Sequence, residues 1–172
     1  PGSGTEMVIR LKFKLAEAED VPDAPQPASQ EEQIDFSGKR LLLVEDNMIN
    51  MEIAQMILTQ LGFVIETAEN GQIAVDMVSA SKPGYYDLIL MDIQMPVMDG
   101  YTATKTIRAL ENPEMAQIPI VAMTANTFAE DIRASEEAGM QGHIAKPIDV
   151  NVMTQILTTV LRNDQNERCL PH

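Results

Sequence analysis

Short, strongly apolar segments recur from residue 41 onward, and the segments between them carry apolar residues at helical spacing. Several of the short segments are apolar throughout, which is typical of strands that are buried on both faces of a parallel sheet. Strands that alternate with helices in this way predict an α/β domain. The five strands are expected at residues 41–45, 64–68, 88–91, 118–123 and 143–145.

Five further segments have the periodicity of helices. The first is expected to run from about Asn50 to Gly62, because glycine suits a left-handed helix end. One apolar face is expected on this helix, made of Ile53, Met56, Ile57 and Leu61. The next three helices are expected over 71–81, from Asp99 or Gly100 onward, and around 128–135. In the last helix we expect Asp149 to be the N-cap and the buried stripe to be Met153, Ile156, Leu157, Val160 and Leu161.

The 172 residues divide by composition into four parts. Residues 1–16 include the alternating segment Met7–Leu15, which predicts a single strand. Residues 17–38 are rich in Pro, Ala, Gln, Asp and Glu and predict a linker, because such a composition buries too little apolar area to order itself. The α/β domain is expected at 39–163, and a C-terminal tail at 164–172.

Composition narrows the possible functions. Lys and Arg number 12 against 26 Asp and Glu, so the formal net charge of −14 disfavours binding to nucleic acid or to an anionic membrane surface. The apolar runs are shorter than a bilayer span requires, and no leader segment is recognisable. The single cysteine, Cys169, allows no internal disulfide. We therefore expect a soluble protein in a reducing, cytoplasmic setting, with no direct membrane contact.

Polar residues follow four of the predicted strands. Glu45 and Asp46 end the first, Asp92 the third, Thr124 the fourth and Lys146 the fifth. Each of them alone could be a helix cap or a surface residue. Because the carboxyl ends of parallel strands meet at one edge of the sheet, where ligands bind in such folds, their joint placement indicates a site.

Three carboxylates at one edge repel one another, by about 4 kcal/mol for each pair at roughly 4 Å and an effective dielectric constant near 20. Proton uptake by one acid or a bound divalent cation could offset this repulsion. The charges favour the cation, since three carboxylates, Mg²⁺ and Lys146 sum to zero. Such a site suits an incoming phosphoryl group, and Asp92 on the middle strand is the natural nucleophile.

Four motifs carry a resemblance to a known family. They are Leu-Leu-Val-Glu-Asp-Asn at 42–47, Leu-Ile-Leu-Met-Asp-Ile-Gln-Met-Pro-Val-Met-Asp-Gly at 88–100, Ile-Val-Ala-Met-Thr-Ala-Asn at 120–126 and Ala-Lys-Pro-Ile at 145–148. In this order they resemble the receiver (response-regulator) domain of two-component signalling over about residues 40–163. The resemblance implies a doubly wound, flavodoxin-like fold with five helices and strand order 2-1-3-4-5.

The same resemblance implies the roles of the site residues. Asp92 would accept a phosphoryl group from a phosphohistidine, and Mg²⁺ would be held by Glu45, Asp46, Asp92 and the main-chain carbonyl of Gln94. Thr124 and Lys146 would bind the phosphoryl oxygens. The peptide bond between Lys146 and the following proline would be cis.

One position departs from the family. Three residues before the lysine, receivers usually have an aromatic residue that turns inward when the threonine moves toward the phosphoryl group, and here that residue is His143. An imidazole is smaller and titratable. His143 is either a working switch residue with altered energetics or a surface histidine at the start of a strand.

The motifs look like those of the receiver of a hybrid sensor histidine kinase, attached at its C-terminal side. Residues 2–5, Gly-Ser-Gly-Thr, and the strand at 7–15 resemble the end of the ATP-binding domain of such kinases, although 2–4 could also be a cloning remnant. The kinase active site is absent from this fragment. The implied partners are a histidine kinase domain and a histidine phosphotransfer domain, and an unpaired strand at 1–16 could support a homodimer.

Three other functions fit the same architecture less well. A phosphatase of the haloacid-dehalogenase type uses a strand-end aspartate with Mg²⁺, but needs a second aspartate where this chain has Gln94. A flavin-binding module would need a loop rich in Ser, Thr and Gly after the first strand, where Glu45 and Asp46 stand. A receiver that only docks, without phosphorylation, would not need the intact acidic set.

Overall fold

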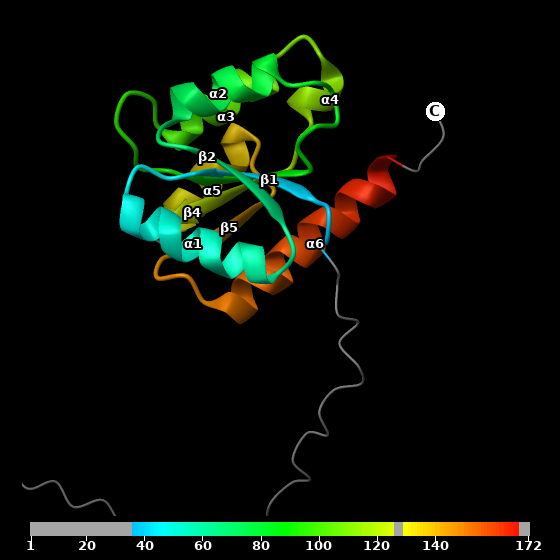
Figure 1. Cartoon of the computed structure of the whole chain (residues 1–172). Coiled ribbons are helices and arrows are strands. Elements are labelled where there is room, and N and C mark those ends of the chain that lie inside the picture. The colour runs from blue at the N-terminus through cyan, green and yellow to red at the C-terminus, as the bar shows by residue number, and fades with distance from the viewer. Residues whose placement is uncertain (1–35, 126–128, 169–172) are drawn as a thin grey trace, which may run out of the picture. The chain divides into compact units, whose positions relative to one another are not determined.

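The computed structural model describes residues 36–125 and 129–168, which form a five-stranded sheet surrounded by helices (Figure 1). All four pairs of neighbouring strands are parallel, and the strand order is β2-β1-β3-β4-β5. This confirms the predicted α/β class and the strand order that the resemblance implied. The segment Met7–Leu15 and residue 128 lie outside the described residues.

The strands agree with the predicted segments to within two residues at either end. They are β1 (Arg40–Val44), β2 (Val64–Ala68), β3 (Leu88–Asp92), β4 (Ile120–Thr124) and β5 (Gly142–Ala145). Every residue of β3 and β4 is buried, because these inner strands are covered on both faces. Their apolar sequences therefore show no alternation, as expected for a parallel sheet.

The described part of the chain has six helices, one more than the sequence predicts, and five of them connect strands. They are α1 (Met48–Gln60), α2 (Gly71–Ala80), α3 (Gly100–Arg108), α4 (Pro113–Ala116), α5 (Ala129–Ala138) and α6 (Val150–Arg168). The additional helix, α4, is a single turn that Asn112 caps and Pro113 begins. Residues 164–168, assigned to the tail from composition, continue α6 as helix.

The sheet has a buried apolar layer on each face. Alternate residues of the inner strands, among them Leu41, Leu90 and Met123, pack with α1 and α6. Their neighbours, such as Leu42 and Ile89, pack with α2 and α3 on the other face. Figure 1 shows α1 and α6 on one side of the sheet and α2 and α3 on the other. Because all four strand pairs are parallel, the carboxyl ends of the strands form one edge of the sheet between these two layers.

The expected apolar face of α1 was only partly right. Ile53 and Met56 are 48% and 65% exposed, whereas Ala54 and Leu58 are the fully buried residues of this helix. Apolar residues lie on several sides of α1, so their spacing alone does not decide which stripe faces the sheet. Ala54 and Leu58 pack into the buried layer with the strands, and Ile53 and Met56 point outward.

The predicted cap of the last helix is confirmed. Asp149 Oδ1 accepts hydrogen bonds from the main-chain N–H groups of Asn151 and Val152. None of the helices among the described residues is long and apolar enough to cross a membrane.

Candidate phosphoacceptor site

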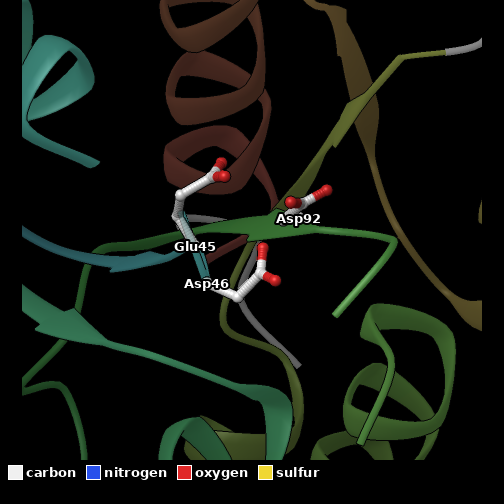
Figure 2. Close-up of side chains that lie close together, drawn as sticks. All are labelled: Glu45, Asp46 and Asp92. Carbon is white, nitrogen blue, oxygen red and sulfur yellow. The ribbon is translucent and has the colours of Figure 1, made fainter. Parts of the chain in front are cut away.

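Three acidic side chains meet at the carboxyl edge of the sheet, as predicted. Glu45 and Asp46 directly follow β1, and Asp92 is the last residue of β3, the adjacent strand. One carboxylate oxygen from each lies within 4.8 Å of the other two. Glu45 and Asp92 are only 2% and 5% exposed, while Asp46 is exposed. Figure 2 shows the three carboxylates gathered at the ends of the two strands.

Lys146 brings a positive charge to the two buried acids. Its Nζ donates hydrogen bonds to Glu45 Oε2 at 2.6 Å and to Asp92 Oδ2 at 2.7 Å. The main-chain N–H of Lys146 donates to the carbonyl oxygen of Thr124 at 2.8 Å, which fixes the start of the loop after β5. The peptide bond between Lys146 and Pro147 is cis, as the resemblance implied.

The remaining oxygens of the buried acids also have donors. Asn50, in the first turn of α1, donates from Nδ2 to Glu45 Oε1 at 3.0 Å. The main-chain N–H of Gln94 donates to Asp92 Oδ1 at 3.2 Å. Each buried carboxylate is therefore held by a lysine on one oxygen and an amide on the other. Sequence reasoning missed the role of Asn50, because only the path of α1 brings it back over Glu45.

Thr124 and His143 occupy different positions relative to this cluster. Thr124 is the last residue of β4, is buried, and lies beside Ala145 in the parallel register. This places it at the same edge as Asp92. His143 pairs with Ala122, farther from the edge, and lines a groove between α5, β5 and α6. Its role as a switch residue stays a prediction.

Burial and neighbouring groups act in opposite directions on the pKa values of Asp92 and Lys146, and the net shift of each pKa is upward. Burial raises the pKa of the Asp92 carboxyl, and although Lys146 lowers it, the net shift is upward, with the charge of Glu45 adding to the rise. Burial lowers the pKa of Lys146, but its hydrogen bonds to Asp92 and Glu45 outweigh this effect and raise it overall. Lys146 is therefore held in its charged form.

The ligand atoms at this edge suit a hard divalent cation. The site offers carboxylate oxygens from three residues, and Mg²⁺ typically takes one or two carboxylates together with water and phosphate oxygens. Lys146 supplies one positive charge against three negative ones. A cation would balance the remaining charge, so the residues fit the predicted metal.

The loop after β3 packs tightly against Asp92. A Cβ added to Gly100 would lie 2.2 Å from the carbonyl oxygen of Asp92, so only glycine fits. Asp99 Oδ1 accepts a hydrogen bond from the main-chain N–H of Thr102 and caps α3, at the place where the sequence predicts a helix start. Asp99 thus begins a helix and is not among the clustered acids.

A parallel sheet that carries three carboxylates and a lysine at its carboxyl edge has the architecture of a signalling receiver domain. The family model of the response regulator receiver domain matches residues 41–158, and the chain belongs to this family.

Curated relatives of this chain include histidine kinases from several eukaryotes. The chain is 38% identical over 127 residues to the peroxide stress-activated histidine kinase mak1 of Schizosaccharomyces pombe, with 73% of the chain covered. It is 42% identical over 119 residues to the hybrid signal transduction histidine kinase B of Dictyostelium discoideum, with 64% covered. It spans only 8% and 6% of these two proteins.

Two similar solved structures bear on the site. The receiver domain of the sensor histidine kinase PA1611 from Pseudomonas aeruginosa, which has a magnesium ion in its active-site cleft, is 38% identical with a TM-score of 0.65. The match covers 73% of this chain and 98% of that one. The receiver domain of Ssk1 from Saccharomyces cerevisiae, solved with the histidine phosphotransfer protein Ypd1, is 32% identical with a TM-score of 0.64, over 71% and 88%.

Proposed function

We propose that this receiver domain takes a phosphoryl group from a phosphohistidine onto Asp92 and passes it to a histidine phosphotransfer domain. The observation that supports this most is the paired bonding of Lys146 to the buried Asp92 and Glu45, with Asp46 beside them. This arrangement provides a carboxylate nucleophile whose surroundings can neutralise an incoming phosphoryl group.

The contacts of Asp92 indicate how the phosphoryl group would be transferred from the phosphohistidine. One of its carboxylate oxygens forms the new bond to phosphorus while the bond between phosphorus and the donor imidazole nitrogen breaks, and the imidazole keeps the electron pair. Lys146 lies 2.7 Å from Asp92 Oδ2 and can follow the charge onto the phosphoryl oxygens. The hydroxyl of Thr124 is proposed as a further donor.

Mg²⁺ would be held by Glu45, Asp46, Asp92 and the main-chain carbonyl of Gln94. When bound, it would supply positive charge that offsets the carboxylates and the phosphoryl oxygens. Lys146 would then be shared between the acids and the phosphoryl group. This residue set is a proposal supported by the oxygen ligands present and by the magnesium ion in the similar receiver of PA1611.

The signal would leave the domain through the surface made by residues 126–161, part of which is described. Added phosphoryl charge at Asp92 would draw Thr124 and Lys146 toward it and shift the loops after β3 and β4. His143, on β5, would respond as a switch residue or remain a surface histidine. Coupling between Asp92 and this surface needs only a shift in population between two conformations of the loops after β3 and β4.

The larger protein is proposed to be a hybrid histidine kinase, because the curated relatives include such kinases. Within it, residues 1–16 would end a kinase ATP-binding domain, 17–38 would link, 39–163 would form the receiver, and 164–172 would extend beyond it. The proposed partners are a histidine kinase domain and a histidine phosphotransfer domain. The receiver of Ssk1 in complex with Ypd1 supports the second of these.

A phosphatase of the haloacid-dehalogenase type is the principal alternative. Its chemistry needs an acid two residues after the nucleophile, and that position holds the amide side chain of Gln94. Gln94 therefore offers no side-chain acid for this chemistry, and its main-chain N–H donates a hydrogen bond to Asp92 Oδ1.

Incubation with acetyl phosphate and Mg²⁺ followed by intact mass measurement tests the proposal. We expect one phosphoryl adduct on the wild-type domain and none on Asp92→Asn. Asp76→Asn, which changes an exposed acid on α2, is the matched control and should be labelled like the wild type. Steady turnover of a phosphomonoester without a stable adduct would favour the phosphatase.

A further inference from the structure

Val97 has a backbone conformation that the phosphoacceptor chemistry does not explain. It is the one non-glycine residue with a positive φ, 69°, among the described residues. Its side chain is 84% exposed, more than any other large apolar side chain in the same ranges. A β-branched residue at positive φ is an outlier, because its side chain crowds the backbone there.

The local turn accounts for this conformation. The N–H of Met98 donates to the carbonyl oxygen of Pro96 at 2.8 Å, which closes a three-residue turn around Val97. Turns of this hand are rare and strained. Glycine would adopt the same φ without steric cost. The domain therefore carries strain at a residue whose side chain it does not bury.

Neighbouring hydrogen bonds hold the strained turn in place. The N–H of Gly100 donates to the carbonyl oxygen of Ile93 at 3.0 Å, and the N–H of Gly71 donates to that of Met98 at 3.1 Å. The loop is thus anchored on both sides of Val97. Strain that its surroundings maintain in this way is typical of functional sites, where it presents a group in a fixed position.

The position of Val97 relates it to the phosphoacceptor. It follows Asp92 by five residues, in the loop that packs against the Asp92 carbonyl through Gly100. Because Asp92 is only 5% exposed, a protein that brings a histidine to it must cover the surrounding loops.

The chain segments on either side of the acids are free of charged residues. Residues 93–98 and 47–51 contain no Asp, Glu, Lys or Arg, although the whole chain has a net charge of −14. The second segment includes Met48 and Ile49, which are 72% and 69% exposed. Interface cores are depleted of charged residues and enriched in methionine and aromatic residues. These uncharged segments match a partner surface that is apolar around its histidine.

We propose that Val97 is a specificity-determining contact for the histidine phosphotransfer protein that exchanges a phosphoryl group with Asp92. This inference rests on the proposed function. The strained turn holds the valine side chain outward before the partner binds, so that little conformational entropy is lost on binding. The strain lowers the stability of the free domain, and the valine side chain is already in place when the partner binds.

Two substitutions remove the apolar side chain of Val97, by deleting it or by replacing it with a polar one. Val97→Gly removes both the side chain and the strain, and Val97→Asn keeps a residue that tolerates positive φ but replaces the apolar group. Gly38→Val is the matched control, since Gly38 has φ 83°, has open space around its Cβ position and precedes the amino end of β1, opposite the edge that carries the acids. We expect Val97→Gly to raise the midpoint of thermal unfolding by about 2–6 °C and Gly38→Val to lower it by a similar amount.

Phosphoryl uptake is then measured from two donors, acetyl phosphate and phosphorylated Ypd1. We expect both Val97 variants to be labelled by acetyl phosphate at the wild-type rate but by Ypd1 about tenfold more slowly, the loss that corresponds to one moderate interface contact. Gly38→Val should match the wild type with both donors.

The outcomes are distinct. Wild-type rates of transfer from Ypd1 to both Val97 variants would overturn the proposal, as would wild-type transfer from Ypd1 no faster than from acetyl phosphate at equal concentration. A change in self-association of the Val97 variants, with transfer from Ypd1 unaffected, would assign the surface to a second copy of this chain and also overturn it. Failure of the wild type to be labelled by either donor would instead contradict the proposed function.

Discussion

Replacing Lys146 by methionine should destabilise the domain in a pH-dependent way. Lys146 Nζ bridges two buried carboxylates, at 2.6 Å from Glu45 and 2.7 Å from Asp92, and its own side chain is 18% exposed. Methionine keeps most of the apolar stem but removes the charge. Glu45 and Asp92 would then face each other without a cation between them.

The expected loss of folding stability in Lys146→Met follows from the distance between the Glu45 and Asp92 carboxylates. Two unit charges within 4.8 Å repel by about 3.5 kcal/mol at an effective dielectric constant near 20. Breaking a buried ion pair by removing one partner typically costs 3–5 kcal/mol, so both figures agree on a loss of about 3–4 kcal/mol at pH 8.

The sign of the pH dependence follows from proton uptake. In the variant, one of the two acids relieves the repulsion by binding a proton in the folded state, so its pKa is raised above the unfolded value. A raised carboxyl pKa means that folded stability is retained at low pH and lost as pH rises through the folded pKa. The loss of stability relative to the wild type should therefore be smaller at pH 5 than at pH 8, by about 1–2 kcal/mol.

Urea unfolding of the wild type and Lys146→Met at both pH values, with a chelator present, measures this loss. Lys39→Met is the control, because Lys39 pairs with Asp87 at 2.8 Å near the surface and should contribute only about 0–1 kcal/mol. Adding Glu45→Gln to Lys146→Met should recover at least half of the loss. A loss that is equal at the two pH values, and that Glu45→Gln leaves unchanged, would refute the reasoning.

Three further predictions concern other parts of the site and fold. Asp46→Asn should raise the stability of the metal-free domain by about 1 kcal/mol, because it removes repulsion from Glu45 and Asp92. It should also weaken the rise in thermal unfolding midpoint that Mg²⁺ causes in the wild type, and an unchanged response to Mg²⁺ would exclude Asp46 as a ligand. Gly100→Ala should cost about 3 kcal/mol and impair labelling by acetyl phosphate, because its Cβ would clash with the Asp92 carbonyl; wild-type stability in a melting experiment would contradict the close approach. Arg108→Met should lower the free energy of unfolding in urea by about 3 kcal/mol, since Arg108 donates to the carbonyl oxygens of Ala116, Ile118 and Gly139. Labelling by acetyl phosphate should be unchanged, and a cost under about 0.5 kcal/mol would show that water replaces these hydrogen bonds.

The parts of the fold that sequence could predict are those set by local pattern. β3 and β4 are wholly apolar up to the residue that ends each strand, so both their burial and the position of Asp92 follow from the sequence. Asp149 and Asp99 cap helices in the way their side chains favour. The meeting of Asp46, Asp92 and Lys146 follows from the rule that parallel strands share one carboxyl edge.

Other features depend on contacts distant in sequence. The exposure of Ile53 and Met56 follows from how α1 rotates against the sheet, and several apolar stripes on that helix were compatible with its spacing. The bond from Asn50 to Glu45 and the sharing of Lys146 between two acids depend on packing and not on motif. The strained turn at Val97 depends on hydrogen bonds from both sides of the loop.

Locating the phosphoryl group tests the central claim most directly. After treatment with acetyl phosphate and Mg²⁺, borohydride reduction converts an aspartyl phosphate to homoserine, and peptide mapping identifies the altered position. The account predicts conversion at Asp92 alone. Conversion at Asp46, at another acid, or at no residue of a domain that is folded and saturated with Mg²⁺ would contradict it.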